Sequence, residues 1–153
     1  MKDVEIYTDG ACSGNPGKGG WGAILLYKGK EKALSGFEED TTNNRMEMQG
    51  AIEGLKALKE ACRVKLYSDS AYLIDSFNKG WIYTWERNGW ARGKKKEELK
   101  NQDLWKELYS LTHQHSVEWI KVKGHSDNKY NNRCDKLATG EIAKAINSKG
   151  DQI

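Results

Sequence analysis

Four acidic residues stand at positions where a protein can use a carboxylate for chemistry. They are Asp9, Glu47, Asp69 and Asp135, and each lies at the predicted end of a strand or start of a helix, beside an apolar stripe. Carboxylate oxygens suit hard divalent cations, and Mg²⁺ prefers oxygen ligands while keeping several of its waters. Two such ions about 4 Å apart can activate a water and stabilise the leaving oxygen of a phosphodiester. The four acids together therefore predict a two-metal site that hydrolyses a phosphodiester.

Each acid also has an explanation that involves no chemistry. The pair Asp9-Gly10 could form a turn after the strand, because Asp-Gly is a common hairpin signal. Glu47 and Asp135 are predicted in the first turns of helices, where a carboxylate interacts favourably with the helix dipole. Asp69 could be the N-cap of the helix that follows it. These alternatives stay open for each residue taken alone.

A repeated strand ending favours the chemical interpretation. Tyr7-Thr8-Asp9 and Tyr67-Ser68-Asp69 end two predicted strands in the same way, which would bring two carboxylates together at one edge of a sheet. Neighbouring carboxylates repel each other and raise each other's pKa, which brings no structural benefit. A bound cation would relieve that repulsion.

The elements that must position these acids follow from the period of the apolar residues. This period predicts strands at 4–8, 21–27, 31–37, 63–68 and 117–122, and helices at 43–61, 71–78, 101–112 and 131–147. Three short strands in series predict an antiparallel meander, and the strand, helix and strand after it predict a mixed sheet in an α/β (α+β) fold. Residues 10–22 are predicted as a Gly-rich loop whose backbone approaches another part of the protein closely. Residues 1–148 are predicted to form a single domain, and 149–153 a frayed tail.

Composition limits the class of protein. The chain has 153 residues, of which 37% are hydrophobic and 31% charged, an ordinary mix for one soluble domain. No apolar run approaches the roughly 20 residues of a membrane span, and the strand that starts at Val4 leaves no room for a signal peptide. Three cysteines without a C-x-x-C motif indicate a reducing, cytoplasmic setting. A zinc site is an alternative use of the histidines, but its candidate ligands match no known spacing: His113, His115, His125 and Cys134.

Basic charge is concentrated in one stretch of the chain. Residues 79–100 contain seven Lys or Arg and three Glu, a local charge of +4 in a protein whose net charge is +3. Trp81 and Trp85 precede the basic residues at a spacing that makes them neighbours on a helix. Aromatic rings interleaved with cations predict a nucleic-acid groove. The alternatives are a tryptophan pair packed in the core and a solvated run of charge.

Five motifs, in order and at fitting intervals, resemble those of type 1 ribonuclease H in its bacterial form. They are Y-T-D-G-A-C-S-G-N-P-G (7–17), T-T-N-N-R-M-E-M (41–48), Y-S-D-S (67–70), V-K-G-H (122–125) and N-N-R-C-D-K-L-A (131–138). The resemblance covers nearly the whole chain. It implies a ribonuclease H-like fold, with a five-stranded mixed sheet flanked by helices and a protruding basic handle. The implied activity is cleavage of the RNA strand of RNA–DNA hybrids by a monomer with two Mg²⁺ ions, for which Mn²⁺ can substitute, leaving 5′-phosphate and 3′-hydroxyl ends.

The resemblance also assigns roles to individual residues. The metal-binding acids of the family correspond to Asp9, Glu47, Asp69 and Asp135, and the histidine of its mobile loop corresponds to His125. Its handle corresponds to Trp81–Lys100, which makes these residues candidates for substrate binding: Trp81, Trp85, Lys94, Lys95 and Lys96.

Further residues correspond to positions that contact the hybrid. Cys12, Asn15, Asn43 and Asn44 match positions that follow the minor groove, where short polar side chains can reach 2′-hydroxyls and base edges. Thr42 matches a position that holds a DNA phosphate. One departure affects this surface, because Ala71 stands where bacterial relatives often have a Gln that contacts the groove.

Three other functions remain as rivals. A catalytically silent domain would bind hybrids without cutting them. A DNA nuclease or strand-transfer enzyme could place similar acids around metal ions on a related fold. A small-molecule phosphatase would fit the metal site, but it would leave the aromatic and basic stretch at 79–100 unexplained.

Overall fold

The computed structural model describes residues 1–93, 95, 97–124 and 128–150, without the side chains of 149 and 150. Along the chain the elements are β1 (Lys2–Ser13), β2 (Gly17–Tyr27), β3 (Lys30–Thr41), α1 (Asn43–Lys56), β4 (Cys62–Ser68), α2 (Ala71–Asn78), α3 (Trp81–Arg87), β5 (Ala91–Arg92), β6 (Glu97–Glu98), α4 (Gln102–Gln114), β7 (Ser116–Lys121) and α5 (Lys129–Gly150). Within these residues no helix is long and apolar enough to cross a membrane. Of the predicted frayed tail at 149–153, residues 151–153 lie outside the described residues, whereas residues 149 and 150 belong to α5.

The central sheet has five strands in the order β3-β2-β1-β4-β7. β1, β2 and β3 pair antiparallel as a meander, whereas β4 pairs parallel to both β1 and β7. Parallel neighbours need a crossover connection, and α2 to α4 supply it between β4 and β7. α1 leads from β3, at the edge of the sheet, to β4 on the far side of β1. The mixed five-stranded sheet predicted from the sequence is confirmed.

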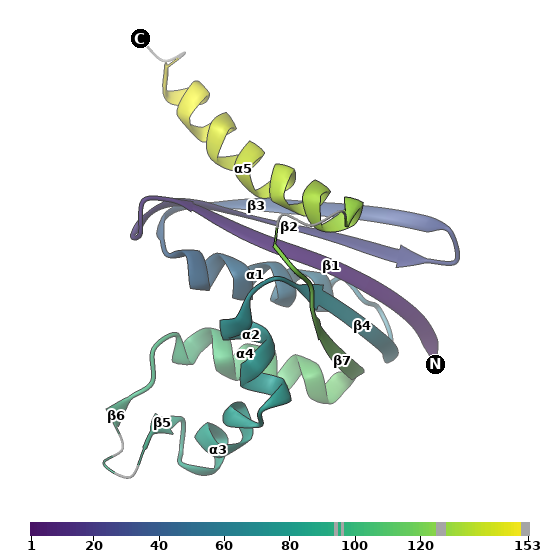
Figure 1. Ribbon diagram of the computed structural model, residues 1–153, viewed down its shortest axis with the longest axis vertical. Coiled ribbons are helices and arrows are strands. Elements are labelled where there is room, and N and C mark those ends of the chain that lie inside the picture. Colours follow the sequence, from purple (N-terminus) through teal and green to yellow (C-terminus); the bar gives the residue numbers. More distant parts are fainter. Residues whose placement is uncertain (94, 96, 125–127, 151–153) are drawn as a thin grey trace.

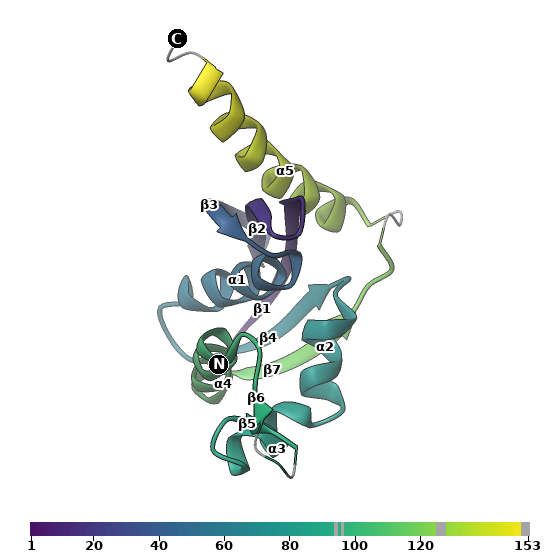
Figure 2. The ribbon, with the colours of Figure 1, turned by 90° about the vertical axis from the view of Figure 1, so that its left-hand side faces the viewer.

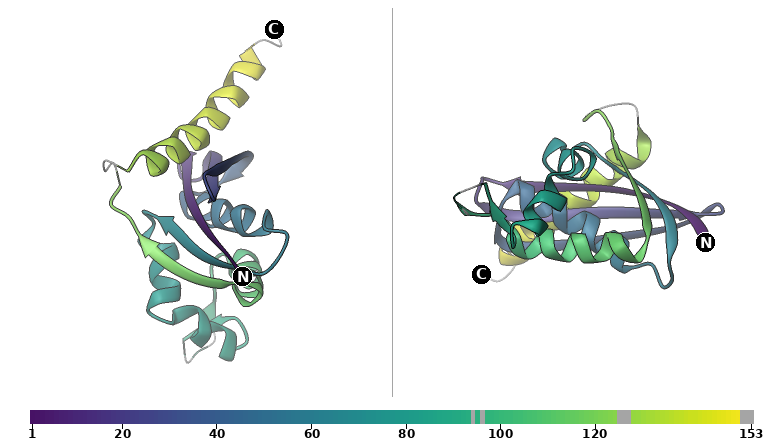
Figure 3. Two further views of the ribbon diagram at one scale, coloured as in Figure 1. Left: turned by 90° about the vertical axis from the view of Figure 1, so that its right-hand side faces the viewer. Right: turned by 90° about the horizontal axis from the view of Figure 1, so that it is seen from below.

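Helices cover the two faces of the sheet unequally. α5 lies alone on one face, over β1 to β3, while α1 to α4 lie on the other face (Figures 1 and 3). The larger core forms on the face of α1 to α4, where buried side chains include Ile6, Ile52, Leu66 and Trp105. A smaller cluster of Tyr7, Ile24 and Cys134 forms under α5. The alternation of apolar residues along β1 reflects these two cores, because successive side chains of a strand point to opposite faces.

The predicted Gly-rich loop at 10–22 is wrong as secondary structure. β1 continues through Asp9 to Ser13, β2 begins at Gly17, and Asp9 pairs directly with Gly22. The close backbone approach is confirmed, since a Cβ on Gly20 would lie 2.1 Å from the carbonyl oxygen of Ala138 in α5. Glycines inside a strand commonly mark such a contact. The Asp9-Gly10 pair is therefore part of a strand and not a hairpin turn.

Two predicted helix boundaries are also wrong. α1 ends at Lys56 and not at residue 61, although Leu58 beyond it still packs on the core and so prolongs the apolar pattern. α5 begins at Lys129, two residues earlier than predicted. The first turns of α1 and α5, both within the described chain, therefore contain no acid. The helix dipole acts mainly within the first turn, so it does not explain Glu47 and Asp135.

The basic handle, residues 81–100, lies at the opposite end of the protein from the last turns of α5 (Figure 2). It consists of α3 and the two short antiparallel strands β5 and β6. Both Trp81 and Trp85 lie on α3, as their spacing predicted.

Candidate active site

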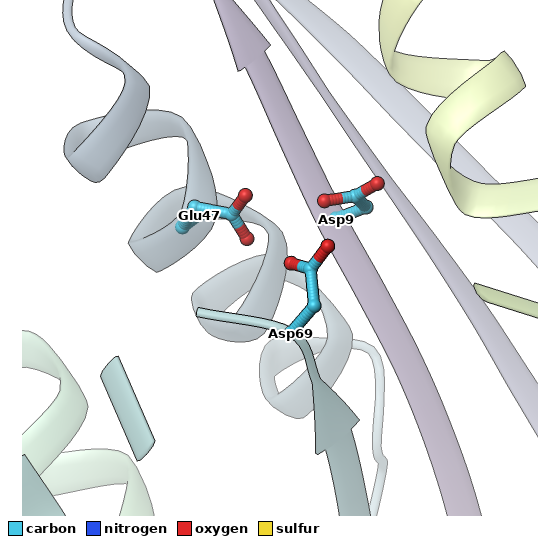
Figure 4. A group of neighbouring side chains, drawn as sticks. All are labelled: Asp9, Glu47 and Asp69. Carbon is cyan, nitrogen blue, oxygen red and sulfur yellow. The ribbon is translucent and has the colours of Figure 1, made fainter. Parts of the chain in front are cut away.

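Three of the four predicted acids come together in the structure. Asp9, Glu47 and Asp69 each offer a carboxylate oxygen, and these oxygens lie within 4.8 Å of one another. Asp9 comes from β1, Asp69 follows the end of β4, and Glu47 reaches them from α1 (Figure 4). Segments far apart in sequence therefore build one acidic cluster.

The strand pattern explains why the cluster forms at this place. The parallel pairing of β1 with β4 ends at Tyr7 and Tyr67, so that the two strands part beside Asp9 and Asp69. By strand alternation Asp9 points to the same face as Tyr7, the face of α5. Glu47 comes from the helix on the other face and reaches Asp9 where β4 no longer covers the edge of β1. The repeated strand endings thus have the consequence predicted from the sequence.

The structural alternatives for Asp69 do not apply. The N-cap of α2 is Ser70, whose Oγ accepts a hydrogen bond of 3.1 Å from the backbone N–H of Leu73. Asp69 therefore precedes the cap and is free of that task.

Burial and mutual repulsion raise the pKa values of Asp9 and Glu47. Asp9 is 5% exposed, and burial, followed by the nearby Asp69 carboxylate, raises its pKa to about 7. The backbone N–H of Gly10 donates a hydrogen bond of 2.9 Å to Asp9 Oδ1, which partly offsets these effects. Burial, followed by Asp9 and Asp69, raises the pKa of Glu47 well above its usual value. Without a bound cation, ionisation of Asp9 and Glu47 at neutral pH is therefore less favourable in the folded protein than in water.

The donor set fits a divalent cation. Glu47 is 4% exposed, and its Oε2 has no hydrogen-bond partner among the described residues. A buried polar atom without a partner is costly, and a metal ion would satisfy it. The three carboxylates converge in a cavity whose described lining residues include no Lys or Arg, and they match the oxygen ligands that Mg²⁺ and Mn²⁺ accept.

Asp135 lies in the same cavity as the cluster but is not one of its three members. A cavity of about 520 Å³ is lined by all four acids together with residues from α1, α2 and the start of α5. Asp135 is in the second turn of α5, which approaches from the face opposite to α1. A second cavity, of about 580 Å³, lies around Asp3 and Glu5 near the start of β1 and contains none of the four acids.

The short polar residues predicted to follow the minor groove gather beside this cavity. Asn15 Oδ1 accepts a hydrogen bond of 3.1 Å from the backbone N–H of Asn43, which joins the β1–β2 turn to the start of α1. Cys12 and Asn44 line the cavity. Thr42 is the N-cap of α1, and its Oγ1 accepts from the backbone N–H of Arg45 at 3.2 Å. Its own O–H remains a possible donor for a phosphate oxygen.

The residues predicted in the handle have unequal environments. Trp81 is 42% exposed, and Lys79 Nζ lies 5.5 Å from its ring centroid. Trp85 is half-buried and packs on Trp105, with ring centroids 5.3 Å apart. Lys95 is exposed. Three further candidates lie outside the described residues: Lys94, Lys96 and His125.

The structure adds residues to the cavity wall that sequence analysis missed. Tyr72 lines the cavity, and its hydroxyl accepts hydrogen bonds from Asn101 at 3.0 Å and Trp105 at 3.2 Å. Asn131 also lines it, is 3% exposed, and has an Oδ1 without a partner among the described residues. Neither has a sequence signal, because a tyrosine on an amphipathic helix and an asparagine near a helix start are both common. Ala71, the position noted as a departure from bacterial relatives, also lines the cavity.

Comparison with known proteins identifies the family to which this chain belongs. The RNase H family model matches residues 1–143. The chain belongs to the RNase H family. Ribonuclease H of Caldanaerobacter subterraneus subsp. tengcongensis is 65% identical over 143 residues, which cover 94% of this chain and 93% of that protein. Ribonuclease H of Acetivibrio thermocellus is 65% identical over 144 residues, which cover 94% of this chain and 97% of that protein.

Solved structures of RNase H proteins share the fold. LC9-RNase H1, a type 1 RNase H with the type 2 active-site motif, has a TM-score of 0.81 and 30% identity, over 92% of this chain and 72% of that chain. LC11-RNase H1, solved in complex with an RNA/DNA hybrid, has a TM-score of 0.67 and 21% identity, over 94% of this chain and 99% of that chain. The second likeness shows the fold alone, whereas the family rests on the sequence matches.

Proposed function

We propose that this RNase H family member is a metal-dependent endonuclease that hydrolyses the RNA strand of RNA–DNA hybrids, leaving 5′-phosphate and 3′-hydroxyl ends. The observation that carries the proposal is the convergence of Asp9, Glu47 and Asp69 within 4.8 Å, in a chain that is 65% identical to proteins named Ribonuclease H. The hybrid bound to LC11-RNase H1 shows that a protein of this fold accepts such a duplex.

The acids of the cavity would hold two Mg²⁺ ions, with Mn²⁺ as a substitute. Asp9 would contact both ions, Glu47 and Asp69 would complete one site, and Asp135 would complete the other. Two bound ions supply an activated water and a stabilised leaving oxygen. The unpaired Oε2 of Glu47 and the raised pKa of Asp9 support this assignment, because a cation would satisfy the one and reverse the other.

The remaining residues of the chain would orient the substrate and handle protons. Cys12, Asn15, Asn43 and Asn44 would follow the minor groove, where the 2′-hydroxyl distinguishes RNA from DNA. The O–H of Thr42 would donate to a phosphate of the DNA strand. These assignments are supported by the placement of Cys12, Asn43 and Asn44 along the wall of the acid cavity.

The handle would bind the flanking duplex, and His125 would assist turnover. Trp81, Trp85 and the lysines at 94, 95 and 96 would contact the phosphate backbone, since cations near an aromatic ring in sequence suit it. His125 would help to move protons or release product, so its loss should slow turnover without abolishing it.

The proposal extends to the assembly state and the compartment. We expect a monomer in the cytoplasm, with residues 1–148 acting as one catalytic domain. The three cysteines are free, as a reducing compartment requires.

The proposal is tested with three end-labelled duplexes of one sequence, RNA–DNA, RNA–RNA and DNA–DNA, incubated with the protein and Mg²⁺. The expected result is internal cutting of the RNA strand of the hybrid alone. Cutting of DNA would favour a DNA nuclease or strand-transfer enzyme. Binding of the hybrid without cutting, even with Mn²⁺, would identify a silent binding domain and would refute the proposal.

A further inference from the structure

The fourth acid reaches the cavity on a helix whose distance from the sheet is set by glycines. Gly22 in β2 pairs with Asp9 across the strands, so their side-chain positions point to the same face, that of α5. A Cβ built on Gly22 would lie 2.6 Å from the carbonyl oxygen of Cys134 and 2.7 Å from the Cβ of Leu137. Both distances are far below an ordinary van der Waals contact of about 3.5–4 Å. The second turn of α5 can therefore lie this close to β2 only when residue 22 has no side chain.

This contact lies next to the proposed metal ligand in sequence and in space. Cys134 immediately precedes Asp135, and its Sγ donates a hydrogen bond of 3.2 Å to the carbonyl oxygen of Tyr7, two residues before Asp9. The backbone that carries Asp135 is thus held against β1 and β2 at the level of Asp9. Across the sheet, a Cβ on Gly10 would lie 2.4 Å from the backbone nitrogen of Glu47. Glycines on opposite faces therefore set the depths of the two helices that carry acids: Gly10 for α1, and Gly20 and Gly22 for α5, of which Gly22 is the one beside Cys134 and Asp135.

The acids on the two helices differ in how close they lie to the carboxylate cluster. Glu47 belongs to the group of carboxylates within 4.8 Å, whereas Asp135 lines the cavity but is not in that group. Because Asp135 lies at the edge of this group, its contribution to metal binding depends most on the position of its backbone. A ligand displaced by about 1 Å can lose on the order of 10- to 100-fold in metal affinity or rate.

We infer that Gly22 is a positioning residue: by letting α5 contact β2 opposite Asp9, it sets the reach of Asp135 and so the affinity of the second metal ion. The inference rests on the proposed two-metal function. Gly22 touches neither metal nor substrate and acts only through Asp135. Gly22→Ala would displace the second turn of α5 by a fraction of an ångström to about 1 Å.

The test compares Gly22→Ala with Gly36→Ala. A Cβ on Gly36 would lie 2.4 Å from the ring of Trp21, so this control also crowds the sheet, but it does not meet α5. Two quantities are measured for each variant: the Mg²⁺ concentration for half-maximal cleavage of the hybrid, and the rise in Tm caused by Mn²⁺, which reports binding without catalysis. Gly22→Ala should need about 10-fold more Mg²⁺ and should show a Tm rise reduced toward that of Asp135→Asn. Gly36→Ala should lower the Tm of the metal-free protein but keep both metal responses.

Lengthening the acid gives a readout that a loss of stability alone would not produce. Asp135→Glu extends the carboxylate by one methylene. In the otherwise unmodified protein, Asp135→Glu should raise the Mg²⁺ requirement. In the double variant with Gly22→Ala, it should lower the requirement at least threefold relative to Gly22→Ala alone. If Gly22→Ala does not fold, Ala138→Val offers the same displacement from the helix side, because Ala138 is fully buried and its backbone nitrogen lies 3.4 Å from a Cβ on Gly22.

Several results would overturn the inference. They are an unchanged metal response in Gly22→Ala, an equal loss in Gly36→Ala, and an effect of Asp135→Glu that is the same in both backgrounds. Failure of the proposed function is a separate outcome. The unmodified protein would then leave the hybrid uncut, while the Tm rise with Mn²⁺ would still show whether Gly22 governs metal binding through Asp135.

Discussion

The acid cavity and the basic handle meet the same proposed substrate, but the protein holds them in opposite ways. Asp9 and Glu47 are 5% and 4% exposed, and they project from a strand and a helix that pack into the cores. The handle ends in two strands of two residues each, and its backbone has positive φ at Gly89, Trp90 and Gly93. It is attached to the core through the buried Ile82 and Leu99 and the half-buried Trp85 and Trp90.

This difference follows from what each region must do. Metal ligands need positions fixed to a fraction of an ångström, and only packed elements on several sides provide that precision. Phosphate binding through exposed cations tolerates imprecise geometry, since it is a screened, long-range attraction. The cavity therefore holds charges whose burial costs stability, whereas the handle keeps its charges in water. Changes to the charges of the cavity should alter catalysis and stability in opposite directions, and changes to the charges of the handle should alter affinity alone.

The largest expected effect is that of Asp9→Asn. It removes the carboxylate proposed to contact both ions, so the cleavage rate should fall on the order of 10³-fold or more, from several kcal/mol of lost transition-state stabilisation. The same change should stabilise the metal-free protein at pH 7.5 by about 1–3 kcal/mol, because the pKa of Asp9 is raised to about 7 in the fold. Cleavage assays and chemical denaturation in EDTA measure the two effects.

The dependence of this stabilisation on pH has a definite sign. A carboxyl group whose pKa is raised in the folded state binds its proton more tightly there than in the unfolded chain. The contribution of protonated Asp9 to stability is therefore fully present below about pH 4 and is lost as pH rises through 7. The gain from Asp9→Asn should therefore appear as pH rises from 4 to 7.5. Asp3, on the same strand, is the control: its pKa is lowered by the hydrogen bond with Arg63, so Asp3→Asn should destabilise the protein at neutral pH. An Asp9→Asn variant that is less stable at pH 7.5 would contradict the account of the cavity.

In the unmodified protein, the effect of added metal on the Tm should depend on pH, because metal and protons compete for the acids of the cavity. Mg²⁺ or Mn²⁺ should raise the Tm strongly at pH 8 and weakly at pH 5.5, because protons compete for Asp9 below its pKa of about 7. Removal of the ion with EDTA should reverse the rise. Scanning calorimetry at the two pH values measures it. Equal rises at both values would mean that the metal binds somewhere other than the cavity.

Neutralising the handle should alter affinity without altering the chemical step. The triple variant Arg92→Gln, Lys95→Gln and Lys100→Gln should raise KM for the hybrid about 10-fold or more at 100 mM salt and reduce the slope of log affinity against log salt by about 2–3. The value of kcat and the Tm should stay close to those of the unmodified protein. The matched control neutralises Lys28, Lys30 and Lys32 in and after the β2–β3 turn, where they are exposed and remote from the handle. An equal effect in this control would assign the binding to net charge and not to the handle.

Features that depend on short segments could be predicted from the sequence, whereas features that depend on packing by distant elements could not. The strands and the meeting of Asp9 with Asp69 follow from local patterns, because alternation and a repeated strand ending are properties of short segments. The continuation of β1 through Gly10 to Ser13 does not, because glycines that look like a loop become strand residues only when a distant helix packs on them. The position of Asp135 in the second turn of α5 was missed because the helix was predicted to begin at 131: Tyr130, four residues before Cys134, continues the apolar stripe but stands alone in a polar segment.

The smallest expected effect divides the two tryptophans that the sequence treated as a pair. Trp85 packs on Trp105 and is half-buried, so Trp85→Ala should cost about 2–3 kcal/mol of stability, less than the loss for a fully buried ring. Trp81→Ala should change stability by no more than about 0.5 kcal/mol, but it should raise KM for the hybrid several-fold through the loss of an exposed ring.

Tyr83 provides the control for this pair, because it lies on the same helix and is 42% exposed, like Trp81. Its ring packs edge-on to Tyr109, away from the face that Trp81 shares with Lys79. Tyr83→Ala should therefore leave KM unchanged in the same cleavage assay. If Tyr83→Ala and Trp81→Ala raise KM alike, α3 binds the hybrid through general apolar exposure. If neither does, the handle acts through its cations alone, and the aromatic residues before them belong to the core that supports it.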